Sequence, residues 1–325
     1  MVAGLVDGLV ALGHAVTLYA AGDSTSGSTL RAHYAQAVWP PNPTRELVHA
    51  ATSVWDILER REVDLVHVHC PAALAFAPLV PLPMIYTVHH ARDEAICELI
   101  ESVKRAQLTT IAISYRQRAL LGCGEATVIH HGLPPARYAF GAGAGGYAVF
   151  LGRFSRDKGV AEALDAAARA SVPLRLAGRP HPEDADYFRD QLASRLAREG
   201  VRWFGEVGPE AKARLLGGAV ATLFPATWEE PFGLVMIESM LCGTPVIAFP
   251  RGSVAEVVEE GVTGFVVDSV DAMAERVRAL VSGAPFDRAR CRAVAVSRFG
   301  VDRMVAAYAA LYAATVARPA LAEVR

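Results

Sequence analysis

Short runs rich in apolar and β-branched residues alternate with amphipathic stretches along the chain. The runs predict buried strands, and the stretches between them repeat apolar residues at helical spacing. Strands are predicted at 15–19, 64–69, 84–88, 109–113, 127–130, 147–151, 174–177, 201–204, 219–224, 246–249 and 264–267. Because strands and helices alternate, we predict an α/β fold with parallel sheets covered by helices on both faces.

The predicted helices include one at each end of the chain. The others are predicted at 46–60, 91–104, 115–121, 160–170, 185–197, 209–216, 232–241, 254–260, 270–282 and 288–298. In the first, Leu5, Leu9 and Leu12 share one face and Gly13 marks the end. The last, at 301–316, is apolar on one face. An α/β domain normally begins with a strand, so we expect the first strand either to be missing or to lie upstream of Met1.

Two halves of similar plan meet at a linker rich in glycine and proline, residues 132–146. Its Gly141, Gly143 and Gly146 have the GxGxxG spacing, but a dinucleotide-binding fingerprint follows a strand and opens a helix. Here a loop precedes the glycines and a strand follows them, so we interpret the linker as a hinge. The predicted domains are 1–140 and 146–299, and the final helix, about 301–317, is expected to pack back onto the first.

Composition excludes some classes of protein. The 325 residues are 52% hydrophobic, which allows two sizeable cores, and 32 basic against 34 acidic side chains leave a net charge of −2. That charge gives no general electrostatic reason to bind nucleic acid. Five cysteines without a CxxC pair favour a reducing cytosol over a disulfide framework.

Neither a membrane span nor a signal peptide is predicted. The longest apolar run, 71–88, contains four prolines and therefore cannot form one regular helix. The amino-terminal stretch has no basic lead and carries Asp7, which argues against a signal peptide. We expect a cytoplasmic enzyme.

Residues 224–250 form the most informative stretch, a predicted strand, loop, helix and strand. In open α/β sheets, ligands bind at such loops, at the carboxyl ends of the strands. The loop carries two adjacent carboxylates, Glu229 and Glu230, and then Pro231, which is expected at the first helical position. The stretch therefore predicts a ligand site at the start of a helix.

The helix start suits an anion. The free N–H groups of Phe232, Gly233 and Leu234 are predicted to attract a phosphate. Glu238 lies eight residues beyond Glu230, which is roughly 12 Å along a helix and about the span of a sugar diphosphate plus a ribose. The alternative is an ordinary helix with one capping and one solvated glutamate.

A second candidate site is GRFSRDKG, residues 152–159, directly after a predicted strand. Arg153 offers a planar fork of donors and Lys158 a compact charge, a pair suited to a diphosphate. It is not a P-loop, because GxxxxGK[ST] is absent. Two solvated cations on a surface loop are the alternative, but both lie at a strand end in the same domain as Glu230, which favours a binding function.

GRFSRDKG, EEPFGLVMIE and CGTPVIAFPRGSVAEVVEEGVTGFVV resemble the retaining glycosyltransferases of family 4, the glycogen synthase-like or group 1 enzymes. The resemblance runs from about Leu5 to Tyr312 and is densest in the second half. Glu230 and Glu238 fit the E-x7-E signature of that family, whereas VDLVHVHCP and YTVHH are less specific matches. The resemblance implies the GT-B fold, in which two Rossmann-like domains face each other across a cleft.

The resemblance also implies an activity: a sugar moves from a nucleotide-diphosphate sugar to an acceptor hydroxyl with its anomeric configuration retained. Arg153 and Lys158 would hold the diphosphate, Glu230 the donor sugar and Glu238 the ribose. His89 would lie near the transferred sugar. The other donor-binding residues would be Gly152, Phe232, Gly233 and Leu234. No residue is assigned as a covalent nucleophile.

No metal and no cofactor are expected, since the basic pair would serve in place of a cation. The partners would be the nucleotide sugar donor and an acceptor that is a sugar, a lipid-linked sugar or a small molecule. Peripheral contact with a membrane is left open. The base, the sugar and the acceptor are not predicted.

This sequence departs from the family at its start and before the hinge. The family begins with a strand and a glycine-rich loop, and this sequence begins at the helix that follows them, so a truncated start is expected and activity of this chain is in question. Before the hinge, His131-Gly132 stands where many members have Asn-Gly, and His131 is given no role.

Three alternatives stay open. A non-catalytic sugar-nucleotide-binding protein would fit the missing strand, and a nucleotide-sugar epimerase would share the fold, although E-x7-E argues against it. Histidines at predicted strand ends could instead form a metal site, although no carboxylate or cysteine set completes a known spacing. These are His67, His69, His89, His90, His130 and His131.

Overall fold

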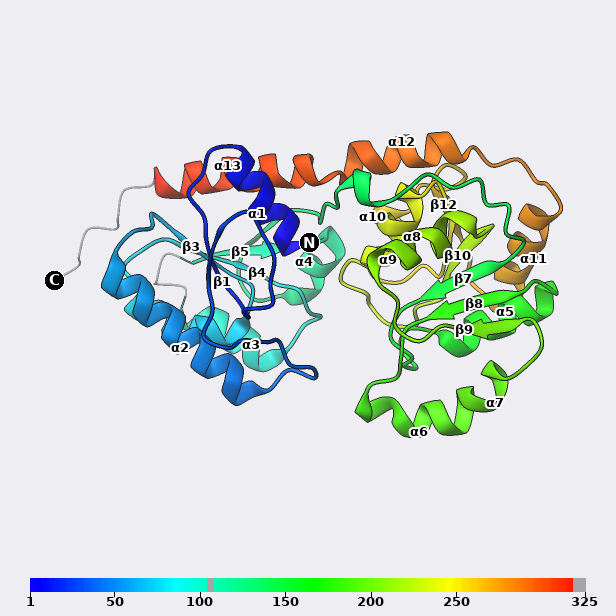
Figure 1. The fold of residues 1–325 in the computed structure, drawn as a ribbon, viewed down its shortest axis with the longest axis horizontal. Helices are drawn as coiled ribbons and strands as arrows, with labels where there is room; N and C mark the ends of the chain where they lie inside the picture. The colour runs from blue at the N-terminus through cyan, green and yellow to red at the C-terminus, as the bar shows by residue number, and fades with distance from the viewer. Residues whose placement is uncertain (104–107, 318–325) are drawn as a thin grey trace. The chain divides into compact units, whose positions relative to one another are not determined.

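The computed structural model describes residues 1–103 and 108–317. The chain divides into two compact units, Met1–Gly132 together with the segment from Val301 onward, and Leu133–Gly300. Each unit holds a parallel β-sheet with helices on both faces, shown as a ribbon in Figure 1. The predicted α/β fold with parallel sheets is therefore confirmed.

The sheet of the N-terminal unit has four strands in the order β3-β4-β5-β6, all parallel. They are β3 (Val66–Val68), β4 (Met84–Thr87), β5 (Leu108–Ala112) and β6 (Ala126–Val128). A separate pair, β1 (Thr17–Tyr19) and β2 (Thr29–Arg31), is also parallel. The short strand β2 was not predicted, because its three residues lack a distinct apolar pattern.

Helices cover both faces of that sheet. On one face, α1 (Val2–Ala11) packs against α13 (Val301–Val316), and Leu5, Ile111 and Tyr308 share their apolar cluster. On the other face lies a second cluster, which includes Leu74 and Ile100. Its helical elements are α2 (Pro43–Arg60), the 3₁₀ segment η1 (Pro71–Leu79), α3 (Glu94–Ser102) and α4 (Tyr115–Leu121).

The C-terminal unit has a six-stranded parallel sheet in the order β12-β11-β10-β7-β8-β9. The strands are β7 (Ala148–Leu151), β8 (Leu174–Ala177), β9 (Val201–Trp203), β10 (Ala221–Phe224), β11 (Val246–Ala248) and β12 (Gly264–Val266). Because β7 is followed by β8 and β9 on one side and the chain returns to β10 on the other, the sheet changes winding direction between β7 and β10.

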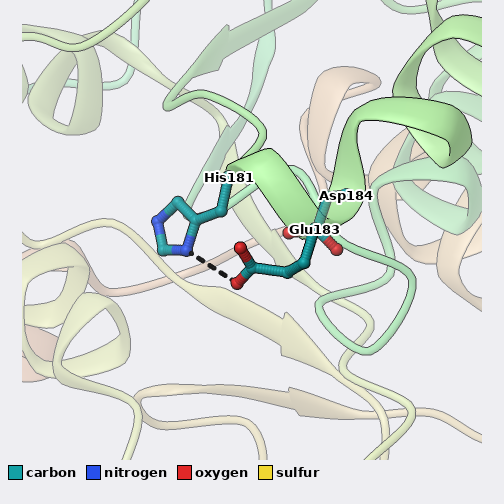
Figure 2. A group of neighbouring side chains, drawn as sticks. All are labelled: His181, Glu183 and Asp184. Carbon is teal, nitrogen blue, oxygen red and sulfur yellow. Dashed lines mark ion pairs between the residues drawn. The ribbon is translucent and has the colours of Figure 1, made fainter. Parts of the chain in front are cut away.

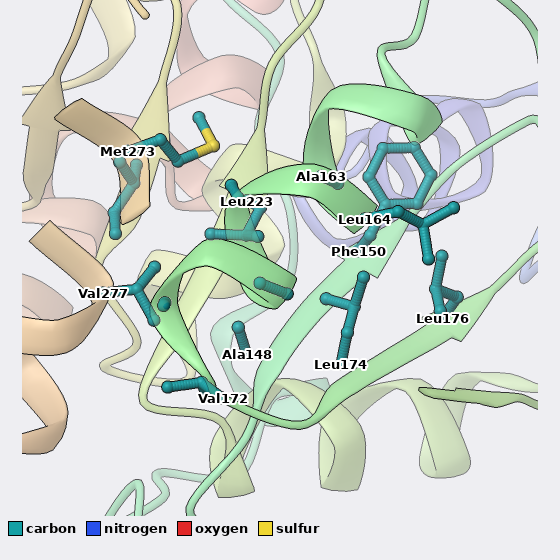
Figure 3. Packing of buried hydrophobic residues seen from close by; sticks show 14 of the residues in the cluster. Ala148, Phe150, Ala163, Leu164, Val172, Leu174, Leu176, Leu223, Met273 and Val277 are labelled. Carbon is teal, nitrogen blue, oxygen red and sulfur yellow. The ribbon is translucent and has the colours of Figure 1, made fainter. Parts of the chain in front are cut away.

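One face of this sheet carries α5 (Val160–Ala170) and α11 (Val270–Val281). Figure 3 shows Phe150, Leu174 and Leu223 from the strands packed against Leu164 and Val277 from these helices. The other face carries α8 (Pro209–Gly218), α9 (Leu234–Leu241) and α12 (Arg288–Phe299), with α9 in contact with both neighbours. Strand and helix positions are therefore fixed by apolar cores on both faces.

Some helix boundaries differ from the prediction for local reasons. The helix predicted at 185–197 contains a π-helical turn, Phe188–Leu192, between Ala185–Tyr187 (α6) and Ala193–Leu196 (α7). The helix predicted at 254–260 ends early, as α10 (Val254–Val257). The predicted end of the third helix at Lys104 lies outside the described residues. Within the part that the structure describes, no helix combines the length and apolarity needed to cross a membrane.

Candidate functional site

The two loops singled out in the sequence follow neighbouring strands. Residues 152–159 follow β7, residues 225–233 follow β10, and these strands pair in the middle of the C-terminal sheet. Their carboxyl ends flank the point where the winding direction changes, which is where open α/β sheets bind ligands. Two segments about 70 residues apart in the sequence, both rich in charge, therefore meet at one place.

Lys158 and Glu230 form an ion pair through Nζ and Oε2. The indole Nε1 of Trp228 donates to the same Oε2 at 2.9 Å, and Lys158 Nζ lies 4.7 Å from the centre of the Trp228 ring. Glu230 is only 8% exposed, so its charge is compensated rather than hydrated. Trp228 was not singled out in the sequence, because a single tryptophan in a loop has no characteristic spacing.

Backbone contacts join the two loops. Thr227 N–H donates to Asp157 O at 2.9 Å. Gly159 has φ +76°, and a Cβ atom at this position would lie 2.0 Å from Pro225 O. Any side chain at 159 would therefore push the loop after β7 away from the loop after β10 and separate Lys158 from Glu230.

Gly159→Ala is expected to destabilise the C-terminal unit by about 3 kcal/mol or more, from the left-handed φ and the clash together. Gly261→Ala is the matched control, because Gly261 has φ +73° but a Cβ atom there would meet nothing within 4 Å. The free energy of unfolding of Gly261→Ala should fall by only about 1–2 kcal/mol. Urea unfolding of both variants measures the difference, and equal losses would show that the Pro225 contact does not matter.

The helix after the Glu230 loop begins later than predicted. α9 starts at Leu234, and Gly233 precedes it with φ +72°. The prediction that Pro231 occupies the first helical position is therefore wrong. The cause is the neighbouring loop: Ser253 N–H donates to Glu230 O at 3.0 Å, and Ser253 Oγ donates to Phe232 O at 2.7 Å. These bonds hold residues 230–232 in a non-helical path, so the separation estimated along a continuous helix does not apply.

Glu238 lies on α9, is 8% exposed and has two partners. Lys212 Nζ from α8 pairs with its Oε1 at 2.5 Å, and Tyr138 OH donates to the same atom at 3.0 Å. Burial, together with the Glu238 carboxylate, raises the pKa of Tyr138 well above its ordinary value, so the hydroxyl stays a donor. Sequence reasoning missed Tyr138 and Lys212, since neither belongs to a motif.

A cavity of about 310 Å³ lies beside these groups. Gly152 and Arg153 line it from the loop after β7, Glu238 from α9 and Lys212 from α8. Arg179 and Glu206, from the loops after β8 and β9, complete its polar wall. The cavity thus joins the predicted basic loop to the second glutamate of the E-x7-E pair.

Carboxylates surround Arg153. Its guanidinium lies 3.2 Å from Asp157, 3.5 Å from Glu183 and 3.6 Å from Asp184. Figure 2 shows Glu183 and Asp184 beside His181, with His181 Nδ1 3.4 Å from Glu183 Oε1. Arg153 is thus held by several acidic partners at the edge of the cavity.

Within the described residues, His181, Glu183 and Asp184 are the only group of three whose ligand atoms lie within 4.8 Å of one another. Because both carboxylates lie within 4 Å of the Arg153 guanidinium, we interpret them as its partners rather than as metal ligands. The histidines of the N-terminal unit form no such group in the described chain. The hypothesis of a metal site at those histidines is therefore not supported.

Four of those histidines form a row instead, in which His131 is buried and His67, His69 and His89 are partly buried. His69 Nδ1 lies 2.8 Å from His89 Nε2, and the ring of His89 stacks on His131 at 5.3 Å between centres. His67 contacts Tyr312 OH at 2.6 Å and Thr87 Oγ1 at 2.8 Å. Burial lowers the pKa of His89 to about 4 and of His67 to about 3, and it lowers those of His69 and His131 well below the ordinary value. These imidazoles are therefore neutral at pH 7.

This row makes stability depend on pH. Because the folded-state pKa of His89 is about 4 and the ordinary value is 6.5, the unfolded chain binds more protons between these values. The N-terminal unit should therefore lose stability as the pH falls below about 6.5, by up to about 1.4 kcal/mol per pH unit for each such histidine. Calorimetric Tm values between pH 7.5 and 5 measure the slope.

His69→Asn should flatten that slope, whereas His33→Asn, a change at an exposed position, should leave it unaltered. A Tm that is constant from pH 7.5 to 5 would contradict the lowered pKa values of this histidine row.

Comparison with known proteins matches both halves of the chain. Residues 143–295 match the model described as "Glycosyl transferases group 1", and residues 1–137 match "Glycosyltransferase Family 4". The chain belongs to the group 1 glycosyltransferases. The predicted membership of this family is thereby confirmed.

Individual similar proteins support this family assignment. Alpha-maltose-1-phosphate synthase of Mycolicibacterium smegmatis is 38% identical over 157 residues, 43% of this chain and 39% of that protein. The matched region thus spans about two fifths of that curated relative. AviGT4, a glycosyltransferase involved in avilamycin A biosynthesis, is 29% identical with a TM-score of 0.72, over 97% of this chain and 89% of that chain.

Anabaena Alr3699/HepE, solved in complex with UDP, has a TM-score of 0.76 at 21% identity, over 96% of both chains. At that identity the likeness concerns the fold, and it confirms the GT-B prediction for this glycosyltransferase.

Proposed function

We propose that this protein transfers a hexose from a nucleotide-diphosphate sugar to an acceptor hydroxyl, retains the anomeric configuration and uses no metal. The observation that carries the proposal is the ion pair between Lys158 and Glu230, which joins the loops after β7 and β10, together with a cavity lined by Arg153 and Glu238. Cations and carboxylates in one place suit a ligand with an anionic centre and hydroxyl-rich ends.

The diphosphate is assigned to Arg153 and Lys158. Both cations are held by carboxylates, Arg153 by Asp157, Glu183 and Asp184, and Lys158 by Glu230. A diphosphate would take over part of these contacts, and two fixed positive charges would then stabilise the charge that develops on the leaving nucleotide. This role is the one that a divalent cation fills in metal-dependent phosphate chemistry.

The two glutamates are assigned to hydroxyl groups. Glu230, released from Lys158, would accept hydrogen bonds from the donor sugar. Glu238 lines the cavity beside Lys212 and would accept from the ribose. The amides of Phe232, Gly233 and Leu234 and the backbone of Gly152 are assigned to the phosphate and the sugar, as the family resemblance implies. The packing around Gly233 requires glycine, because a Cβ atom there would lie 2.8 Å from Met236 and 3.0 Å from Phe224.

Departure of the diphosphate before attack of the acceptor on the same face would retain the configuration without a covalent intermediate. Glu230 is therefore not assigned as a covalent nucleophile. The resemblance assigns His89 to the transferred sugar, and its burial makes it a neutral hydrogen-bonding group rather than a cation at pH 7, because the pKa of its imidazole is lowered to about 4.

Similar proteins support the choice of donor. HepE was solved in complex with UDP-glucose as well as with UDP, and AviGT4 is described as a glycosyltransferase. A nucleotide-diphosphate sugar is therefore the donor class that we propose for this chain. The base, the sugar and the acceptor stay unassigned.

Donor hydrolysis and transfer in EDTA test the proposal. UDP-, GDP- and ADP-sugars are supplied with a panel of sugar, lipid-linked and small-molecule acceptors, and the anomeric configuration of the product is read by NMR. The expected result is turnover of at least one α-linked donor, with the α configuration kept. Inversion, or activity only with added metal, would refute the mechanism. Binding without turnover would favour a non-catalytic sugar-nucleotide-binding protein instead.

A further inference from the structure

Helix α2 of the N-terminal unit is apolar on two sides. Its inner side packs into the core of the unit through Val54 and Ile57, and the helix covers one face of the sheet (Figure 1). Its other side carries Leu47, Val48 and Trp55, which are all exposed, Trp55 by 66%. A helix that is apolar all round is normally covered all round, whereas a helix on a protein surface has a polar outer side. The outer side of α2 therefore lacks the polar pattern of a solvated surface.

The exposed apolar residues form one continuous stripe. At about 100° per residue, Leu47, Val48, Ala51 and Trp55 fall on the same side of α2. We call these four residues the outer stripe. Ala51, at its centre, is small enough to let a second helix approach closely. Continuous exposed apolar patches on globular proteins mark surfaces that bind a partner.

Opposite charges lie near the two ends of the outer stripe. Arg45 lies near its beginning, and its guanidinium stacks 3.8 Å from the centre of the Tyr34 ring and donates to Gln36 O at 3.3 Å. Glu59 lies near its end and is exposed. Within the part of the chain that the structure describes, neither residue forms an ion pair. The helix dipole disfavours a cation in the first turn and an anion in the last, so α2 itself gains nothing from this placement.

We propose that the outer stripe binds a second copy of this chain, with the two α2 helices antiparallel about a two-fold axis. Arg45 and Glu59 each lie seven residues from Thr52. An axis at Thr52 therefore brings Arg45 of each copy opposite Glu59 of the other and forms two ion pairs. Trp55 of each copy then covers the turn at residues 48–49 of the other.

The rest of α2 fits this register. Glu46, Asp56 and Arg60, the other charged residues of the helix, all come opposite uncharged residues, so no like charges meet. The antiparallel arrangement also places the first turn of each helix beside the last turn of the other, which the two dipoles favour. Because 18 residues of helix are only about 27 Å long, the contact is small. Small interfaces bind weakly, and we expect a reversible dimer with a Kd on the order of micromolar.

A lipid surface suits the outer stripe less well. Helices that lie on a membrane combine an apolar side with an excess of lysine and arginine, which anionic headgroups attract. The charges near the ends of the outer stripe, Arg45 and Glu59, sum to zero instead. Charges of opposite sign at equal distances from a central residue are what an isologous contact requires.

Sedimentation velocity between about 1 and 200 µM protein tests the proposal. The average mass should rise toward that of a dimer. Arg45→Glu and Glu59→Arg should each weaken the dimer at least about tenfold, because each sets like charges opposite each other twice. Both changes place a charge where the helix dipole favours it, so neither should weaken α2 itself. The double variant Arg45→Glu/Glu59→Arg restores opposite charges and should return the Kd to within about threefold of the parent.

Two further variants locate the contact. Trp55→Ser should abolish the dimer, whereas Leu12→Ser should keep it, because Leu12 is 59% exposed at the end of α1 on the opposite face of the sheet. A monomer at every concentration, a dimer that the single charge variants leave unchanged, or a double variant as weak as the single ones would each overturn the proposal. A monomer that cosediments through Trp55 with vesicles of phosphatidylcholine and phosphatidylglycerol would also overturn it and assign the stripe to a lipid surface.

Discussion

Lys158→Met is expected to lower kcat/KM for donor turnover by about 10³-fold. The lysine is one of two fixed cations assigned to the diphosphate, and removing one preorganised stabilising group typically lowers the rate by about 10²–10³-fold. In the folded protein its loss also leaves the Glu230 carboxylate, 8% exposed, without its cationic partner and dependent on the Trp228 Nε1 donor. We therefore expect a loss of stability of about 1–3 kcal/mol in addition.

The two effects of Lys158→Met can be separated. The double variant Lys158→Met/Glu230→Gln removes both charges of the pair, so it should recover most of the stability while staying inactive. Arg156→Met is the matched control, because Arg156 lies in the same loop, is exposed and stacks over Tyr187. Its activity should stay within a fewfold of the parent. Near-normal turnover by Lys158→Met would refute the assignment of this lysine.

Glu230→Gln is expected to lower kcat by about 10²-fold with little change in the affinity for nucleoside diphosphate. The amide keeps one acceptor oxygen but loses the charge that would strengthen the hydrogen bonds to the donor sugar. Steady-state kinetics with the donor, together with titration by the free nucleoside diphosphate, distinguish the sugar from the diphosphate as the group that Glu230 contacts.

Glu229→Gln is the adjacent control for that variant. Glu229 accepts from the backbone N–H of Gly252 at 3.2 Å through an oxygen that an amide can replace. We expect its kcat within a fewfold of the parent. If the two variants lost activity equally, the effect would belong to the loop as a whole rather than to the Glu230 carboxylate.

The sequence was sufficient for the fold class, because each half alternates short apolar runs with amphipathic stretches of ordinary length. It also located the basic loop and the glutamate loop, since motif spacing is local. What brought them together is the sheet order, in which β7 and β10 are neighbours although β8 and β9 lie between them in the chain. Spacing alone does not reveal such a crossover.

Partners from distant segments were beyond prediction. Tyr138 contacts Glu238 across 100 residues, and Trp228 completes the environment of Glu230 without a motif. The start of α9 was misplaced because Ser253 binds the Glu230 loop from outside the predicted helix. The start of a helix is predicted from neighbouring residues in the sequence, and such a prediction takes no account of a hydrogen bond donated by another loop. The sequence singled out Lys158 and Glu230 separately, whereas their direct contact was not foreseen.

Calorimetric titration with nucleoside diphosphates in EDTA tests the central claim most directly. UDP, GDP and ADP are titrated into the protein, the Lys158→Met variant and the Arg156→Met control. The account predicts that at least one diphosphate binds without metal, that Lys158→Met weakens its binding at least about tenfold and that Arg156→Met does not. Binding of none of the three, or binding only when Mg²⁺ is added, would contradict it.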